Sequence, residues 1–464
     1  MPTGRFTFID LFAGIGGFHH ALASLGGKCV MACELDALCR KVYRSSFPEL
    51  PDMQFVENIR TITRETIDDE ASGRSSEEID RRVPDHDVLC AGFPCQPFSK
   101  SGAQLGVRDQ TRGTLFFDIL EILRAKRPKY VMLENVRNLT GPRHRNTWAT
   151  IIKSLRETGY RVSGEPVVLS PHLIPPEHGG APQVRGRVFI LGEYVGPEAN
   201  LEHPRPLLCL NFFHPWKPEV WRVAEILQPD SKIPNVSDYR VQPSERAWLD
   251  AWDAFVQAIP SDTLPGFPIW VEAFTDEPKW TVDMPGWEQN FRRKNAAFYR
   301  ENRDVIDAWL EKRWGPDKLT VREFPRSRQS FEWQARKAHP RRKGRTIQDL
   351  VVQMRPSGIR VKPATYLPAL VAITQTSIVG PKVGGLAEYR KLTPPEAARL
   401  QGIPTDTFLR ANVADRVAYK QLGNGVNVGV VQLAARALMK RNWPVEPSAP
   451  SGKEQPLIPG LLRT

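Results

Sequence analysis

The sequence predicts an α/β fold, a doubly wound mixed sheet with flanking helices and a second, smaller and largely irregular domain. Three observations support this prediction. Short apolar runs alternate with helical patterns over residues 1–194, which is typical of a parallel sheet covered by helices. The alternation is lost over residues 195–385, where ten of the twelve tryptophans lie. It returns over residues 386–440, and a Pro- and Ser-containing stretch at 441–464 is expected to be a loose tail.

The composition is that of a globular protein. Its 464 residues suit two or three domains, and 41% of them are hydrophobic and 25% charged. No apolar run is long enough for a membrane span, and the start MPTGRFTFID does not resemble a secretory signal. Six irregularly spaced cysteines predict neither a disulfide framework nor a zinc site. We therefore expect a cytoplasmic protein without a metal.

The positive charge is concentrated in one segment. The net charge is +12, and residues 292–362 alone hold 20 Lys or Arg against 8 Asp or Glu, so the remainder is neutral. Such a segment is typical of a protein that binds a polyanion, because Lys and Arg make the contacts to phosphate. The alternative is a solvated basic surface.

Individual elements follow from local patterns. We expect strands at 6–12, 28–35, 86–93, 129–136 and 187–194, and helices at 18–26 and 38–47. The polar stretch 60–82 is predicted to be a surface helix or loop. Thr393 and Glu396 form a capping box, so a helix should begin at Pro394 and end near Gln401. A further helix should follow Gly425 and pack beside the N-terminal Gly-rich turn.

That Gly-rich turn lies between the first strand and the first helix. Gly14, Gly16 and Gly17 would let the backbone turn tightly and a ligand approach closely. Glu34 ends the second strand, where a carboxylate suits the two hydroxyls of a ribose. The GxGxxG spacing is not met, so S-adenosylmethionine fits at least as well as NAD. Alone, the turn is weak evidence.

Further candidate residues lie at strand ends. Cys95, in the segment GFPCQPFS, follows the 86–93 strand, where open α/β sheets bind ligands. Glu134 ends the 129–136 strand. Arg185 and Arg187 alternate on one face of a strand, as either a surface ladder or a clamp for an anion or carbonyl. The remaining thiols are interpreted as small buried side chains: Cys29, Cys33, Cys39, Cys90 and Cys209.

Six motifs occur in one order: FIDLFAGIGG, GFPCQPFSKSG, LENV, QVRGR, RKLTPPEAARLQGIP and QLGNGVNVGVV. In this the chain resembles the DNA (cytosine-5)-methyltransferase family, close to its bacterial restriction-modification members. The resemblance covers 1–194 and 386–440. It implies a Rossmann-like sheet of the S-adenosylmethionine-dependent methyltransferases for these residues, and a target-recognition domain for 195–385.

The resemblance also implies catalytic roles. Cys95 would attack C6 of a cytosine flipped out of the duplex. Glu134 would bond N3 and the exocyclic amine, while Arg185 would bond O2 and hold the loop, with Arg187 in support. Gln96 would help to fill the gap in the duplex. Ser99 and Ser101 would contact phosphate or the cysteine turn.

For the cofactor, S-adenosylmethionine, Phe12 would stack on adenine and Glu34 would take the ribose hydroxyls. The rest of the implied site comprises Gly14, Gly16, Gly17, Leu115, Asn424 and Val426. Two positions depart from the family pattern: Leu35 replaces a frequent Trp, and Asn58-Ile59 replaces an Asp-Ile pair. We therefore expect weaker cofactor binding rather than none.

DNA contacts are expected in the most basic stretches of the 195–385 region. The candidates for reading bases are Arg326, Arg328, Arg355, Arg360 and Thr365. For each of them, a contact to phosphate alone or an ordinary surface position is the alternative. The tryptophans are predicted to form the core of this region rather than to stack on bases.

We expect a sequence-specific DNA methyltransferase that binds double-stranded DNA as a monomer and associates with the nucleoid through DNA. A cognate restriction endonuclease or another defence-system protein is a candidate partner. Two alternatives stay open. One is a tRNA cytosine-5 methyltransferase, against which the large 195–385 region argues. The other is a non-catalytic DNA-binding regulator. Against it, such regulators use an extra N-terminal helix-turn-helix, and we expect none here because the first strand begins about five residues into the sequence.

Overall fold

The computed structural model describes residues 6–69, 72–94, 115–203, 205–208, 213, 216–370 and 377–439. The predicted residues Cys95, Gln96, Ser99 and Ser101, together with Cys209 and the expected tail, lie outside this described part.

The larger of the two main sheets has the strand order β10-β6-β9-β5-β4-β1-β2-β3, with β7 paired to β9. Its centre, from β3 to β5, is parallel, and β9 runs antiparallel to β5, β6 and β7. The strands are β1 (Phe6–Leu11), β2 (Gly27–Cys33), β3 (Phe55–Val56), β4 (Val88–Gly92), β5 (Tyr130–Val136), β6 (Tyr160–Ser163), β7 (Val167–Leu169), β9 (Arg187–Tyr194) and β10 (Glu202–His203).

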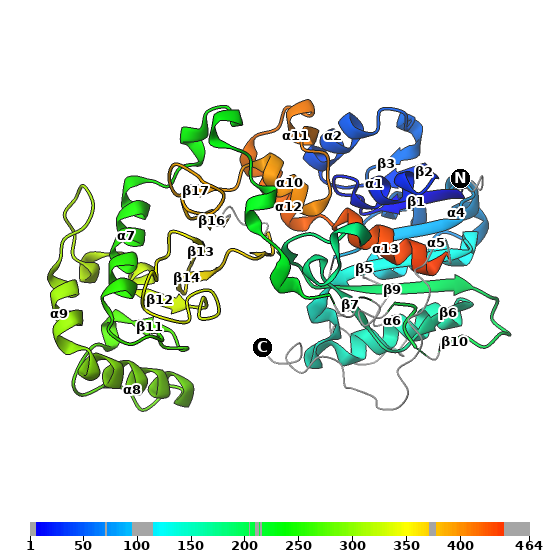
Figure 1. Cartoon of the computed structure of the whole chain (residues 1–464). Coiled ribbons are helices and arrows are strands. Elements are labelled where there is room, and N and C mark those ends of the chain that lie inside the picture. Colours follow the sequence, from blue (N-terminus) through cyan, green and yellow to red (C-terminus); the bar gives the residue numbers. More distant parts are fainter. Residues whose placement is uncertain are drawn as a thin grey trace.

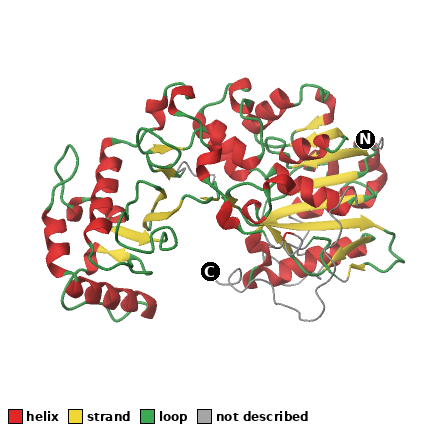
Figure 2. Cartoon of the chain, viewed as in Figure 1, coloured by secondary structure: helices red, strands yellow, loops and turns green. Residues whose placement is uncertain are grey.

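Helices cover both faces of this sheet (Figures 1 and 2). Successive residues of β1 show why: Phe8 packs into the core beneath α1 and α13, whereas Ile9 packs into the opposite core, beneath α4, α5 and α6. A strand buried on both faces is apolar without alternation, as in parallel sheets generally. The helices of this domain are α1 (Gly17–Ser24), α2 (Ala37–Ser46), α3 (Arg60–Thr63), α4 (Ser76–Arg82), α5 (Leu115–Lys126), α6 (Arg145–Glu157), α10 (Pro394–Gln401), α11 (Thr407–Arg410), α12 (Asp415–Asn424) and α13 (Val428–Leu438).

The expectation that the 195–385 region is largely irregular is wrong, because a second sheet, of order β11-β12-β14-β13-β16-β17, is built mainly from it. Figure 1 shows it between α7 and the larger sheet. A short β8–β15 pair (Gln183–Val184 and Leu367–Pro368) ties the two parts together. The remaining elements are α7 (Pro243–Ala258), α8 (Gly286–Glu301), α9 (Arg303–Glu311), β11 (Ile269–Trp270), β12 (Ser330–Trp333), β13 (Leu350–Arg355), β14 (Gly358–Pro363), β16 (Ile378–Val379) and β17 (Arg390–Lys391).

The core of this second part is aromatic. Trp252 of α7 is fully buried and stacks on Phe331 of β12, with ring centroids 4.6 Å apart, and Trp309 and Trp333 are buried beside it. The prediction that tryptophans build the core is confirmed for these residues. Two others differ: the exposed fractions of Trp280 and Trp287 are 43% and 60%.

The strands predicted at 6–12, 28–35, 86–93, 129–136 and 187–194 are confirmed as β1, β2, β4, β5 and β9. Helix α10 begins at Pro394 behind a Thr393–Glu396 capping box, and α13 packs against α1, both as predicted. The polar stretch 60–82 holds the short helices α3 and α4. Each sheet includes one strand beyond the domain boundary expected from the sequence. In the larger sheet, β10 lies after residue 194, and in the second sheet, β17 lies after residue 385. No helix among the described residues is long and apolar enough to cross a membrane.

Candidate active site

The Gly-rich turn connects β1 to α1 through several residues with positive φ. Gly14 and Gly16 have φ values of 55° and 87°, in the left-handed region that favours glycine, and Phe12 shares it at 56°. A Cβ on Gly17 would lie 2.7 Å from Cγ1 of Val426. The turn therefore lies directly against the segment between α12 and α13, and the predicted residues at 12–17 and 424–426 form one site.

Glu34 lies at the end of β2 and faces this turn. Its Oε2 accepts a hydrogen bond from the Gly14 amide at 2.8 Å, and its Oε1 accepts one from the Asp36 amide at 2.8 Å. Leu35, the first departure from the family pattern, is 70% exposed. The carboxylate is thus fixed beside the glycines, where two acceptor oxygens can meet a pair of hydroxyls.

The second departure, Asn58, lies two residues before the short helix α3, and its Oδ1 accepts a hydrogen bond from the Arg60 amide at 3.0 Å. Ile59 behind it is buried. Leu115 is the first residue of α5 and packs at the edge of the same core. Asn424 is exposed at the end of α12.

These residues fit a ligand of the adenosine type. A Cβ built on Gly14 would meet no atom within 4 Å, so the turn faces open space at that point. The carboxylate of Glu34 borders that space, because it holds the Gly14 amide.

Glu134 and Arg187 form the second half of the site. Arg187 Nε donates to Glu134 Oε1 at 2.9 Å, with side chains that are 18% and 11% exposed. Burial raises the pKa of Glu134, and the charges of Arg187 and Arg185 offset part of that shift. A carboxyl group with a raised pKa and a fixed guanidinium can together present both a donor and an acceptor to a planar ligand.

The neighbouring strand β4 ends beside this pair. Gly92 pairs with Glu134 in the parallel register, and a Cβ on Gly92 would lie 3.4 Å from Glu134 Oε2. Asn135 Nδ2 donates to the Phe93 carbonyl at 2.9 Å. Asn135 belongs to the LENV motif but is not among the site residues predicted from the sequence. The structure shows that it anchors the backbone two residues before Cys95.

Arg185 lies differently from the prediction. The prediction that Arg185 and Arg187 share one face of a strand is wrong. Strand β8 ends at Val184 and β9 begins at Arg187, so the two residues do not lie in one strand. Arg185 is 1% exposed and donates to three backbone carbonyls: Gly423 at 2.9 Å, Leu370 at 3.2 Å and Gly425. It therefore holds the segment that carries Asn424 and Val426.

The five candidates for reading bases lie in two places. Arg326 and Arg328 are in a 3₁₀ turn: Arg326 is mostly exposed and ion-paired with Glu272, whereas Arg328 lies over the Trp248 ring and donates to the Arg355 carbonyl. Arg355 and Arg360 belong to the hairpin of β13 and β14, and Thr365 follows it. Their contacts to DNA stay predictions.

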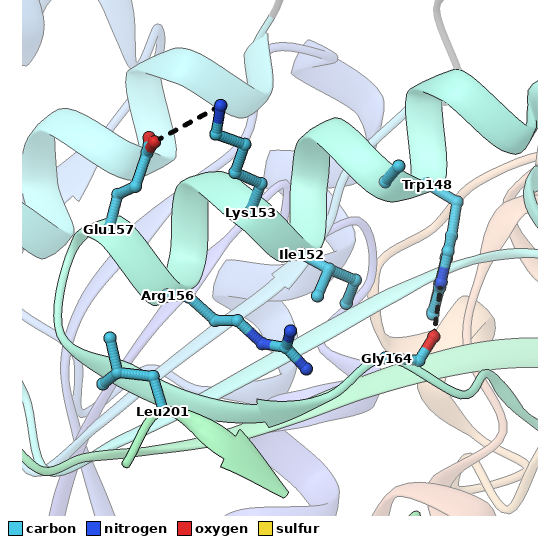
Figure 3. A pocket seen from close by; sticks show the side chains of 8 residues that line it. Trp148, Ile152, Lys153, Arg156, Glu157, Gly164 and Leu201 are labelled. Carbon is cyan, nitrogen blue, oxygen red and sulfur yellow. Dashed lines mark hydrogen bonds and ion pairs between the residues drawn. The ribbon is translucent and has the colours of Figure 1, made fainter. Parts of the chain in front are cut away.

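A surface pocket of about 500 Å³ lies apart from these residues. Figure 3 shows it between one side of α6 and the residues Gly164 and Leu201, where Trp148 donates to the Gly164 carbonyl at 2.8 Å. None of the predicted site residues lines it. The pocket is therefore not part of the predicted cofactor or base site.

Comparisons with known sequences agree on one family. Residues 6–440 match the model of C-5 cytosine-specific DNA methylases. The chain is 38% identical to the type II methyltransferase M.AluI of Cellulosimicrobium cellulans, over 97% of this chain and 95% of that protein. It is 29% identical to the type II methyltransferase M.BanI of Aneurinibacillus aneurinilyticus, over 94% and 96%. A solved S. pombe Dnmt2 methyltransferase covers 94% of the chain at 17% identity, with a TM-score of 0.49.

The family match extends over both sheets and includes every predicted site residue. Membership implies DNA as the substrate and S-adenosylmethionine as the methyl donor. The chain therefore belongs to the C-5 cytosine-specific DNA methylase family and is a DNA (cytosine-5)-methyltransferase.

Proposed function

We propose that the chain methylates cytosine within one short duplex sequence, with Cys95 as the nucleophile. The thiolate of Cys95 forms a bond to C6 of a flipped cytosine, which makes C5 nucleophilic. Bound S-adenosylmethionine supplies the methyl group that C5 accepts. Loss of the C5 proton to a base then re-forms the C5–C6 double bond and expels the Cys95 thiolate. The position of Phe93, anchored by Asn135 beside Glu134, supports this role for the residue two places on.

The observation that carries the proposal is the Glu134–Arg187 pair. With its pKa raised by burial, Glu134 can be protonated and donate to N3 of cytosine, while its other oxygen accepts from the exocyclic amine. We assign the contact to O2 to Arg187 rather than Arg185, and the support for this is that the Arg187 guanidinium contacts the same carboxylate. A hydrogen bond or proton at N3 withdraws electrons from the ring and favours attack at C6.

Arg185 acts in this proposal as a positioning residue for the cofactor. Its guanidinium bonds the carbonyls of Gly423 and Gly425, on either side of Asn424. Burial lowers the pKa of Arg185 to about 9, with the charge of Arg187 acting in the same direction. The fixed segment lies against Gly17 and closes one side of the adenosine-type site.

We further propose that residues 195–385 are the target-recognition domain and that the enzyme belongs to a restriction-modification or related defence system. The concentration of positive charge in 292–362 supports the first statement. The names of the type II relatives support the second. A cognate endonuclease is the partner that this context implies, and the enzyme would act as a monomer in the cytoplasm, on nucleoid DNA.

The test is expression in a bacterial host without cytosine methylation, followed by mapping of 5-methylcytosine across the genome. We expect methylation confined to one short sequence for the natural chain, and none for Cys95→Ser. Binding of S-adenosylhomocysteine by the purified variant serves as the folding control. Methylation by Cys95→Ser at the natural rate, or methylation of tRNA instead of DNA, would overturn the proposal.

A further inference from the structure

Over β12, β14 and the second half of β13, the second sheet has one apolar and one polar face, whereas Val351 of β13 is buried in a separate apolar core. Ile359 and Val361 of β14 point into the core shared with α7 and α9, as do Phe331, Trp333, Val352 and Met354 of the flanking strands. Side chains alternate along a strand, so the intervening residues point the other way. On this second face lie Ser330, Glu332, Gln353, Arg355, Arg360 and Lys362, all partly exposed.

This polar face is turned away from α7. In Figure 1 the sheet lies between α7 and the domain that holds β4 and β5. Burial and the positive charges of Arg360 and Arg355 lower the pKa of Lys362, because the three cations share one face. The face is thus basic and looks toward the part of the molecule that carries Glu134.

Arg360 is held at the centre of this face. Its Nε donates to Glu332 Oε2 at 2.6 Å and its Nη2 to Oε1 at 2.8 Å, with side chains 22% and 21% exposed. Gln334 Nε2 donates to the same Oε2 at 3.1 Å and fixes the carboxylate. A guanidinium has five N–H groups, so three remain, and no described residue accepts a hydrogen bond from them.

Gln353 stands directly across from Arg360 on the other side. The two residues are partners in the antiparallel register of β13 and β14, while Glu332 is the partner of Arg360 in the parallel register of β12 and β14. The Cβ atoms of such partners lie about 4.5–5.5 Å apart. Successive base pairs are about 3.4 Å apart along the DNA axis. Two side chains at that spacing can therefore reach adjoining base pairs.

We propose that Glu332, Arg360 and Gln353 form a row that reads two adjoining base pairs in the major groove, one G·C and one A·T. The inference rests on the proposed function. Arg360, held by Glu332 on one edge, donates from its free edge to O6 and N7 of guanine. The amide of Gln353 donates to N7 and accepts from N6 of adenine. Arg355 and Lys362 flank the row and contact phosphate.

The geometry distinguishes this assignment from an ordinary surface ion pair. A surface pair contributes little to stability and needs no particular neighbours. Here the Glu332–Arg360 pair leaves one edge of the Arg360 guanidinium free to make two hydrogen bonds. Gln353, whose amide suits a different base, lies beside it. Glu332 and Gln353 were not among the residues expected to contact DNA. The alternation of apolar and polar residues in SFEW and LVVQMR is the signal that could have identified them.

The first experiment maps 5-methylcytosine for the natural chain and for Arg360→Ala, Arg360→Lys and Gln353→Ala. We expect a target sequence with adjoining G·C and A·T pairs. Arg360→Ala should lose about 10- to 100-fold discrimination at that guanine only. Arg360→Lys should lose less, and Gln353→Ala should relax the adjoining A·T pair. Arg292→Ala, which breaks an ion pair of comparable burial on α8, is the control and should leave the target unchanged.

A second measurement does not depend on folded variants. Duplexes carrying 7-deazaguanine or 7-deazaadenine at single target positions remove one N7 acceptor at a time. The natural enzyme should lose about tenfold or more in kcat/KM at one guanine and at the adenine beside it. A target without adjoining G·C and A·T pairs, or full activity on every such duplex, would overturn the inference. Absence of 5-methylcytosine for the natural chain would instead overturn the proposed function.

Discussion

Glu134 and Arg187 join β5 to β9 through an ion pair of 2.9 Å that is largely withdrawn from water. Glu134 is the register partner of Gly92, the last residue of β4, and Arg187 is the first residue of β9. Because the pair is mostly buried, either charge without the other would be an unpaired charge in a low-dielectric site. The pair therefore stabilises the fold only while it is intact, and it fixes the direction of both groups.

The first prediction concerns Arg187. Arg187→Ala should lower kcat about 10²- to 10³-fold, as expected when a preorganised donor to the reacting group is removed. The KM for DNA should change much less, because the recognition contacts remain. Arg187→Lys should recover part of kcat, since an ammonium can donate but cannot make the same planar contact. Steady-state kinetics on a duplex that contains the mapped target measures both constants.

Arg246→Ala is the matched control for that series. It breaks a 2.8 Å ion pair with Asp250 that lies on the surface of α7, far in sequence from the site. Its kcat should equal that of the natural enzyme. If the kcat of Arg187→Ala stayed within threefold of the natural value, the proposed contact of Arg187 with the flipped base would be refuted.

The second prediction uses two glycines that both have a positive φ. Gly14 and Gly26 both have positive φ, 55° and 88°, and a Cβ on either would meet no atom within 4 Å. Replacing either by Ala should therefore cost a similar backbone strain, about 1–2 kcal/mol. Only Gly14 lies at the proposed cofactor site. Gly14→Ala should weaken binding of S-adenosylhomocysteine at least tenfold in calorimetry, whereas Gly26→Ala should not; equal affinities would contradict the site.

The sequence predicted five strands of the larger sheet, because a strand buried on both faces is largely apolar, as at 130–136 and 187–194, but it predicted neither the short strands β3, β6, β7 and β10 nor the second sheet. It also located the Thr393 cap, since a capping box is a local pattern. Both features are decided within a few residues. For the same reason the Gly-rich turn and Glu34 were found as one site.

Arg185 shows what local patterns do not contain. Two arginines spaced by one residue suggest a shared strand face, but Gly186 separates β8 from β9 and the arginines point to different partners. Arg185 bonds the carbonyls of residues more than 180 positions later. Glu332 and Gln353 are similar: each is ordinary in its own strand, and only the register of β12, β14 and β13 brings them to Arg360.

The third prediction concerns Asp10, which is fully buried beneath the Gly-rich turn. Burial raises its pKa well above the ordinary 3.8, and the charge of Glu34 adds to the shift, while the His19 amide offsets part of it. No hydrogen bond of ordinary geometry reaches either carboxylate oxygen within the described residues. The folded state therefore holds this proton more tightly than the unfolded state.

The sign follows from linkage. Between 3.8 and the raised pKa the folded state binds more protons, so the free energy of unfolding falls as pH rises, by up to about 1.4 kcal/mol per pH unit. Asp10→Asn removes this dependence. Urea unfolding of both proteins across pH 4.5–8 should show the variant gaining stability relative to the natural chain as pH increases. A difference that stays constant with pH would refute the account.

The last prediction separates the reactive thiol from the buried ones. Burial, with nearby acidic charges, raises the pKa of Cys29, Cys33 and Cys39 to about 12, and Cys90 is raised as well. At pH 8 only about 10⁻⁴ of a thiol with such a pKa is thiolate, the form that alkylates. Iodoacetamide should therefore leave these four cysteines unmodified in the native enzyme while it modifies Cys95, as peptide mass spectrometry would measure. All four should react once urea unfolds the chain. In the folded Cys95→Ser variant, total modification by iodoacetamide should fall, and the four buried cysteines should stay unmodified. If Cys90 in the folded natural enzyme reacted as fast as Cys95, the assignment of Cys95 as the nucleophile would be contradicted.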